Sequence, residues 1–217
     1  MNIPFVGLNR QFKNLESNFI TKLQEVGRSG NYIMGENLKT FEHKIADLCQ
    51  VPYAVGVGTG SDAIFLILKA LGIGDGDEVI TCPNSFIATG WTIVATGAKP
   101  VFVDADDDMN IDPKKIKSAV TEKTKAIVPV HLAGKPAKMK EINKIAKDVN
   151  AFVVEDSAQA LGAKLDEKPV GSFGIAAGFS LHPLKNLGLI GDGGIITTSD
   201  EQLYKDLLLL RNHGLKD

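Results

Sequence analysis

Short apolar runs alternate with longer amphipathic stretches along most of this chain. The apolar runs are rich in β-branched residues and contain few polar positions, a pattern typical of strands that are covered on both faces. They predict seven strands, at residues 53–57, 78–81, 100–103, 126–130, 151–155, 176–180 and 194–198. We therefore expect a sheet with helices on each side.

The stretches around these runs have helical periodicity. They predict helices at residues 14–28, 36–50, 61–71, 85–96, 112–120, 137–148 and 200–213. Asp112 and Pro113 are a typical helix start, because Asp can cap the first amides and Pro is tolerated at the first helical position. The alternation predicts an α/β protein with a mostly parallel mixed sheet sandwiched by helices, with right-handed crossovers. Ligands bind such sheets at the carboxyl ends of the strands.

Composition and charge exclude several classes of function. A net charge of −2 gives no electrostatic basis for binding nucleic acid or a membrane surface. No apolar run approaches the roughly 20 residues that a membrane helix needs. We therefore expect no nucleic-acid partner and no membrane partner.

The N-terminus and the cysteines favour a cytoplasmic location. Residues 1–7 lack a charged segment followed by an apolar one, so no signal peptide is expected. Cys49 and Cys82 have no metal-like spacing, and two cysteines in a lysine-rich chain suit a reducing cytosol. We expect no metal site.

Asp156 and Lys185 are the strongest candidates for chemistry. Asp156 follows the buried run Phe152-Val153-Val154-Glu155, and Lys185 lies in a loop after Ser180. Pyridoxal 5′-phosphate needs a lysine amine that condenses with its aldehyde and a carboxylate that keeps its ring nitrogen protonated. For either residue alone, a capping aspartate or a solvated lysine is the simpler interpretation.

A glycine loop after the first predicted strand fits a phosphate. Gly58, Thr59, Gly60 and Ser61 lead into a helix, whose N-terminus offers free amides and a positive dipole end. Ser180 could add a hydroxyl to the same phosphate. The spacing is not G-x-G-x-x-G, which disfavours a dinucleotide-binding oxidoreductase. A purely structural glycine turn remains open for this segment.

Phe86 has two possible roles. It follows the strand that ends in Thr81-Cys82-Pro83, so its ring could stack on a cofactor ring. A core aromatic at the start of a helix is the simpler alternative.

Several ordered motifs resemble the DegT/DnrJ/EryC1/StrS family of sugar aminotransferases. The matching segments are Gly58-Thr59-Gly60-Ser61-Asp62-Ala63, Pro83-Asn84-Ser85-Phe86-Ile87-Ala88-Thr89, Pro129-Val130-His131-Leu132-Ala133-Gly134, Glu155-Asp156-Ser157-Ala158-Gln159-Ala160, Phe179-Ser180-Leu181-His182-Pro183-Leu184-Lys185, Gly191-Asp192-Gly193-Gly194 and Arg211-Asn212-His213-Gly214. The resemblance runs from about Pro4 to the last residue and implies the large domain of aminotransferase fold type I.

The resemblance implies a role for each candidate residue. Lys185 is the covalent anchor of pyridoxal phosphate and the acid/base of transamination, and Asp156 is the partner of the ring nitrogen. Gln159 lies near the ring oxygen, Phe86 stacks on the ring, and Ser180 and the Thr59 loop hold the phosphate. Tyr32, His131 and His182 are candidate substrate contacts, although an ordinary packed tyrosine and a structural loop histidine are equally simple for Tyr32 and His182.

The implied reaction moves an amino group from L-glutamate to a nucleotide-linked keto-sugar. Some relatives that remove oxygen have histidine at the lysine position, so Lys185 favours transamination. The resemblance also implies a homodimer with its site at the subunit interface. The alternative is a non-catalytic cofactor- or sugar-nucleotide-binding regulatory protein that retains the fold.

Family members are considerably longer than 217 residues. We therefore expect residues 1–217 to form the N-terminal segment and the cofactor-binding large domain, without the small C-terminal domain, and expect this chain alone to be inactive. Leu203, Leu207, Leu208 and Leu210 of the last predicted helix form an apolar surface that we expect to need a partner outside the chain.

Overall fold

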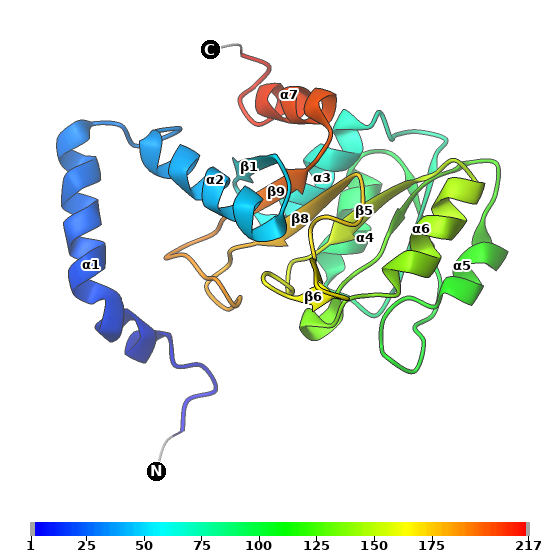
Figure 1. Ribbon diagram of the computed structural model, residues 1–217, viewed down its shortest axis with the longest axis horizontal. Coiled ribbons are helices and arrows are strands. Elements are labelled where there is room, and N and C mark those ends of the chain that lie inside the picture. The colour runs from blue at the N-terminus through cyan, green and yellow to red at the C-terminus, as the bar shows by residue number, and fades with distance from the viewer. Residues whose placement is uncertain (1–2, 216–217) are drawn as a thin grey trace. The chain divides into compact units, whose positions relative to one another are not determined.

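The computed structural model describes residues 3–215, which divide between Phe41 and Glu42 into two compact units (Figure 1). The first unit contains helix α1 (Leu8–Ser29), which begins six residues earlier than predicted and ends at the left-handed Gly30. None of its residues is buried, and the rings of Phe12 and Phe19 stack with centroids 6.0 Å apart. Helix α2 (Glu36–Cys49) begins in the first unit and ends in the second.

The second unit is built on a seven-stranded sheet with the strand order β1-β9-β8-β5-β4-β2-β3. The strands are β1 (Tyr53–Val57), β2 (Glu78–Thr81), β3 (Lys99–Phe102), β4 (Thr124–Val128), β5 (Phe152–Asp156), β8 (Ala176–Ser180) and β9 (Gly194–Thr198). β9 is antiparallel to both of its neighbours, and every other pairing is parallel. The other six strands therefore point the same way, and their carboxyl ends share one edge of the sheet. This confirms the predicted α/β class and the mostly parallel mixed sheet.

Helices cover both faces of the sheet, as Figure 1 shows for α3 and α6. The helices of this unit are α3 (Gly60–Ala70), α4 (Ile87–Ala95), α5 (Pro113–Ala119), α6 (Met139–Asp148) and α7 (Glu201–Leu210). α3, α4 and α7 pack on one face and α5 and α6 on the other. Successive strand residues point to opposite faces, so Val154 joins the first core and Val153 the second.

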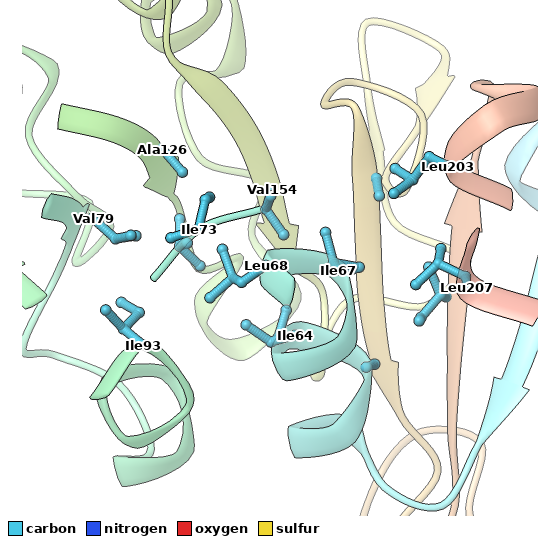
Figure 2. Packing of buried hydrophobic residues seen from close by; sticks show 14 of the residues in the cluster. Ile64, Ile67, Leu68, Ile73, Val79, Ile93, Ala126, Val154, Leu203 and Leu207 are labelled. Atoms are coloured by element: carbon cyan, nitrogen blue, oxygen red, sulfur yellow. The ribbon is translucent and has the colours of Figure 1, made fainter. Parts of the chain in front are cut away.

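Helix α3 lies at the centre of the larger core (Figure 2). Ile64, Ile67 and Leu68 of this helix are almost completely buried against the strands. Burying a side chain of this size contributes roughly 1.5 to 3 kcal/mol, so this contact fixes α3 firmly on the sheet. The N-terminus of α3 is thereby held at the edge where the parallel strands end.

The leucines of α7 differ from the prediction. Leu203 and Leu207 pack in the same core as α3 (Figure 2). Leu208 is partly buried and packs against this core. Only Leu210 remains exposed. Most of the apolar surface of this helix is therefore buried within the unit, because α7 lies against β1 and β9.

Two further differences concern strands. β4 lies two residues earlier than predicted, because the polar Thr124 pairs with Glu78 of β2, whereas Val130 makes only an isolated bridge to Asp156. A short hairpin of β6 (Lys164–Leu165) and β7 (Lys168–Pro169) was not predicted, because two-residue strands leave no periodic signal. Among residues 3–215, no helix is long and apolar enough to cross a membrane.

Candidate active site

A cleft of about 500 Å³ opens at the edge where the parallel strands end, a size typical of small-molecule sites. Its lining comprises Thr59, Gly60, Ser61, Ile64, Ser85, Phe86, Ala88, Thr89, Val130, Asp156, Ala158, Gln159, Ser180, His182, Leu184, Lys185 and Asp192. Nine of these residues are predicted site residues, from four separate segments of the chain. The structure thus brings together most of the candidates that the sequence suggests.

Three predicted residues lie elsewhere. Gly58 flanks the cleft-lining loop without lining the cleft itself. Tyr32 belongs to the first unit, where it is 72% exposed and its hydroxyl donates to the carbonyl of Gly27 at 3.4 Å. His131 is fully buried.

One end of the cleft is formed by the N-terminus of α3. Thr59 is the N-cap, and its Oγ1 accepts a hydrogen bond from the amide of Asp62 at 2.9 Å. The first amides of a helix have no partner within the helix, so those of Gly60 and Ser61 are suited to an anion. Because Thr59 Oγ1 is an acceptor toward Asp62, its hydroxyl proton can point to the same anion.

The glycines of this loop are needed for space rather than for a left-handed turn. Neither Gly58 nor Gly60 has a positive φ. A Cβ on Gly60 would lie 2.7 Å from the Cβ of Ser180, and one on Gly194 would lie 2.1 Å from the carbonyl oxygen of Thr59. These close approaches place Ser180 beside the start of α3, as expected for two groups that share one anion.

Asp156 lies at the end of β5 and is only 6% exposed. Its Oδ2 accepts from the hydroxyl of Thr89 at 2.7 Å, and its Oδ1 accepts from the amide of Ala158 at 3.2 Å. Both carboxylate oxygens are therefore oriented by donors from the protein. A buried carboxylate facing a cleft is suited to bind a cationic N–H group.

Lys185 is half-buried in a loop with several internal hydrogen bonds. Its amide donates to the carbonyl of His182 at 2.8 Å, and the Asn186 side-chain amide donates to the carbonyl of Leu161 at 2.6 Å. A Cβ on Gly188 would lie 2.6 Å from the carbonyl oxygen of Pro183, so the loop turns back on itself closely. This loop orders the lysine backbone at the cleft.

His182 is partly committed to the same loop. Its Nδ1 accepts from the amide of Leu184 at 3.2 Å, which leaves Nε2 as the protonated nitrogen of the neutral ring. His182 is exposed and lines the cleft, so only its Nε2 edge is available to a bound molecule.

The Gln159 side chain has a defined orientation. Its Oε1 accepts from the amide of Ala133 at 2.6 Å, so its NH₂ group remains as a donor. Ala133 lies in the left-handed region with φ 52°, within the short helix η1 (Leu132–Gly134). Gln159 can therefore donate a hydrogen bond to an oxygen acceptor in the cleft.

Phe86 is 70% exposed and lines the cleft, so it is not a core aromatic. Phe86 is the N-cap of α4 and has an extended backbone conformation. Its ring is available to a planar molecule in the cleft.

His131 has no surface to offer a substrate. Its Nδ1 accepts from the amide of Ala137 at 3.0 Å, and its Nε2 lies 3.0 Å from Glu155 Oε2. The first bond requires an unprotonated Nδ1, so Nε2 carries the proton and donates to the carboxylate. The expected substrate contact of His131 is replaced by a structural one, because the residue faces away from the cleft into the protein.

Glu155, which is not among the predicted site residues, is the centre of this buried network. Its Oε2 also accepts from the amide of Gly171, and its Oε1 accepts from the amides of Phe173 and Gly174, at 2.7 to 3.0 Å. Burial, together with the negative charge of Glu155, raises the pKa of Cys49 to about 12 and keeps this thiol protonated. The network fixes β5 immediately before Asp156.

Other cleft residues were missed, notably Ser85, Thr89 and Asp192. Ser85 and Thr89 are four residues apart, a spacing that puts two side chains on one face of the predicted helix 85–96, although in the structure α4 begins at Ile87 and Ser85 lies in the bend before it. That signal was present in the sequence, but the proximity of this face to Asp156 depends on the strand order. Among residues 3–215, no cluster of His, Cys, Asp and Glu suited to a metal ion is found.

Comparison with known proteins places these motifs in a family. The family model described as the DegT/DnrJ/EryC1/StrS aminotransferase family matches residues 13–217. The chain is 48% identical over 217 residues to a pleiotropic regulatory protein of Geobacillus stearothermophilus, covering all of this chain and 58% of that protein. It is 47% identical over 213 residues to dTDP-3-amino-3,6-dideoxy-alpha-D-galactopyranose transaminase of Aneurinibacillus thermoaerophilus, covering 98% of this chain and 59% of that enzyme.

The fold agrees with a solved relative. The structure of NtdA from Bacillus subtilis with bound cofactor PMP superposes with a TM-score of 0.90 at 35% identity, covering 96% of this chain and 47% of that one. The chain thus spans about half to three-fifths of the length of these proteins. With a family model matching nearly its whole length, the chain belongs to the DegT/DnrJ/EryC1/StrS aminotransferase family.

Proposed function

We propose that the protein is a pyridoxal phosphate-dependent aminotransferase that moves an amino group from L-glutamate to a nucleotide-linked keto-sugar. The observation that carries the proposal is a single cleft with an anion-binding helix start, a buried carboxylate and a lysine. These groups match the phosphate, the ring nitrogen and the aldehyde of this cofactor. The bound cofactor in the NtdA structure supports the same assignment.

Each residue has a role in holding the cofactor. The start of α3 with Thr59, Gly60, Ser61 and Ser180 would bind the phosphate through amides and hydroxyls. Asp156 would accept the ring N–H, and Phe86 would stack on the ring. The Gln159 NH₂ group, held by Ala133, would donate to the ring oxygen.

Lys185 carries the proton chemistry. When bound, pyridoxal phosphate supplies an aldehyde that exchanges amino groups and a ring that withdraws electrons. Lys185 Nζ would hold the aldehyde carbon covalently and, once displaced, take up and return a proton as acid and base. The protonated Nε2 of His182 lies at the same cleft and would donate to a substrate oxygen.

The substrate assignment follows from the relatives. The protein from Aneurinibacillus thermoaerophilus is named as a transaminase of a dTDP-linked amino sugar. A nucleotide-linked sugar is therefore the acceptor that we propose, with L-glutamate as donor. The buried free thiols of Cys49 and Cys82 suit the reducing cytoplasm, where we place the protein.

A non-catalytic regulatory function is the second candidate, because the relative from Geobacillus stearothermophilus is named as a regulatory protein. The presence of Lys185 and an enclosed Asp156 in one cleft favours the enzyme. Mixing the cofactor-loaded protein with L-glutamate separates the two functions: an aminotransferase converts the bound cofactor to its amine form, and a binding protein leaves it unchanged.

Covalent trapping tests the proposed site. After incubation with pyridoxal phosphate, reduction with borohydride and peptide mapping by mass spectrometry, we expect the label on Lys185. Lys185→Arg should abolish this label, whereas Lys123→Arg, at an exposed lysine outside the cleft, should retain it. Label spread over surface lysines with Lys185 unmodified would contradict the assignment.

We also propose a homodimer, supported by an apolar face beside the cleft. Ile87, Trp91 and Val94 recur at helical spacing on α4 and are 74%, 55% and 58% exposed, and the exposed Phe102 lies beside the same helix at Gly90. Such a face on a soluble protein is typical of an interface, and its position next to Phe86 fits a site completed by a second copy.

A charged substitution within this apolar face tests the proposed dimer. Trp91→Glu places a carboxylate within the apolar face and should convert a dimer into a monomer in sedimentation velocity. Glu122→Gln, an exposed change elsewhere, is the control and should not alter the sedimentation coefficient. An unchanged dimer in Trp91→Glu would assign the interface to another surface.

A further inference from the structure

Two hydroxyl groups form a chain that ends on the carboxylate of Asp156. Ser85 Oγ lies 2.8 Å from Thr89 Oγ1, and Thr89 Oγ1 lies 2.7 Å from Asp156 Oδ2. Thr89 is 2% exposed and Asp156 is 6% exposed, so the last bond is shielded from water. Both hydroxyls line the cleft together with Asp156.

The direction of these hydrogen bonds follows from their chemistry. A carboxylate only accepts, so the single proton of the Thr89 hydroxyl must point to Asp156. Thr89 then has no proton left for Ser85, and Ser85 must donate to Thr89. The chain therefore runs in one direction, from Ser85 through Thr89 to Asp156.

Two hydrogen-bond donors fix the plane of the Asp156 carboxylate. Thr89 holds Oδ2 from α4, and the Ala158 amide holds Oδ1 from the loop after β5. With one donor on each oxygen, rotation about the Cβ–Cγ bond would break both bonds. The remaining lone pairs keep a constant direction toward the cleft.

We propose that Thr89 is a positioning residue, which orients Asp156 toward the ring nitrogen of the cofactor, and that Ser85 in turn orients Thr89. This inference rests on the proposed function, because it needs a ring N–H group opposite Asp156. It adds a link between α4 and the electronic partner of the cofactor, which no motif in the sequence discloses. A role in packing alone would make Thr89 indifferent to the atom at the ring-nitrogen position.

The test uses two ligands that differ at that atom. Dissociation constants are measured for pyridoxal phosphate and for its 1-deaza analogue, in which a C–H group replaces the ring nitrogen. Thr89→Val keeps the shape of the side chain and removes the donor. We expect it to weaken binding of pyridoxal phosphate about tenfold, the scale of one hydrogen bond to a charged group, and to leave binding of the analogue nearly unchanged.

Two further variants sharpen the result. Thr89→Ser retains the hydroxyl and should restore the affinity for pyridoxal phosphate to within about twofold of the original protein. Ser85→Ala removes only the donor to Thr89 and should show a smaller selective loss, about threefold. If Thr89→Val does not fold, Ser85→Ala still tests the proposal. The measured quantity is the ratio of the dissociation constants of the two ligands for one variant, so it does not depend on Thr89→Val.

Each alternative result has a distinct meaning. Equal weakening of both ligands by Thr89→Val, or no weakening of either, would overturn the proposal, because Thr89 would then shape the cleft without acting on the ring nitrogen. If the unmodified protein binds both ligands equally, Asp156 does not contact the ring nitrogen; that result overturns the cofactor assignment of Asp156, and this proposal with it. Tight binding of pyridoxal phosphate with selective loss in Thr89→Val supports both.

Discussion

Replacing Glu155 with glutamine is expected to lower the free energy of unfolding by about 3 to 5 kcal/mol. The carboxylate is fully buried and accepts four hydrogen bonds, from His131 Nε2 and from the amides of Gly171, Phe173 and Gly174. Glutamine has one oxygen, so its NH₂ group must face two of these donors. Each donor left without an acceptor costs about 1 to 3 kcal/mol.

The histidine cannot relieve this change. His131 would have to move its proton to Nδ1, which already accepts from the amide of Ala137. Urea unfolding measures the loss as a lower transition midpoint with an unchanged slope. Glu122→Gln makes the same chemical change at an exposed position and should shift the midpoint very little. A Glu155→Gln protein as stable as the original would show that the network is not a major source of stability.

Replacing Gly194 with alanine is expected to displace the Thr59 loop, where we propose that the cofactor phosphate binds. Gly194 begins β9 and pairs with Val57 on one side and Ser180 on the other. An added Cβ would lie 2.1 Å from the carbonyl oxygen of Thr59 and 2.8 Å from the amide nitrogen of Gly60. These are backbone atoms of the loop that begins α3, so the loop must move to make room.

We expect Gly194→Ala to cost about 3 kcal/mol of stability and to weaken binding of pyridoxal phosphate at least tenfold. Thermal unfolding and ligand titration measure the two effects. Gly27→Ala is the matched control: outside the backbone of its own helix and its chain neighbours, no atom lies within 4 Å of its added Cβ, and alanine favours the helix by roughly 0.5 to 1 kcal/mol. Normal cofactor affinity in Gly194→Ala would show that the Thr59 loop tolerates displacement.

The periodicity of the chain determined the elements and their class. β1, β2, β8 and β9 occur at the predicted residues, because buried strands and amphipathic helices leave local patterns that need no knowledge of the partner. The antiparallel direction of β9 was not predicted, because the hydrophobic pattern of a strand does not depend on the direction of its neighbours.

The motifs indicated most of the candidate site, since residues at the ends of parallel strands gather at one edge. Thr59 follows β1, Asp156 ends β5, and Ser180 and Lys185 lie at the end of β8 and in the loop after it, and all four line one cleft. A tight turn is not the reason for the glycine in the Thr59 loop. Gly60 leaves room for Ser180, and Gly194 of β9 leaves room for the backbone of the same loop.

The sequence therefore determined which residues are candidates for chemistry. The tertiary structure decided which side chains lie beside them. Glu155 and Asp156 are successive residues of β5 and face opposite sides of the sheet, so Glu155 bonds the buried His131 while Asp156 lines the cleft. Thr89 came to Asp156 because the packing of α4 on the α3 face places it beside the end of β5. Such contacts join residues 24 and 67 positions apart. Strand order and helix packing set them, and neither leaves a local pattern in the sequence.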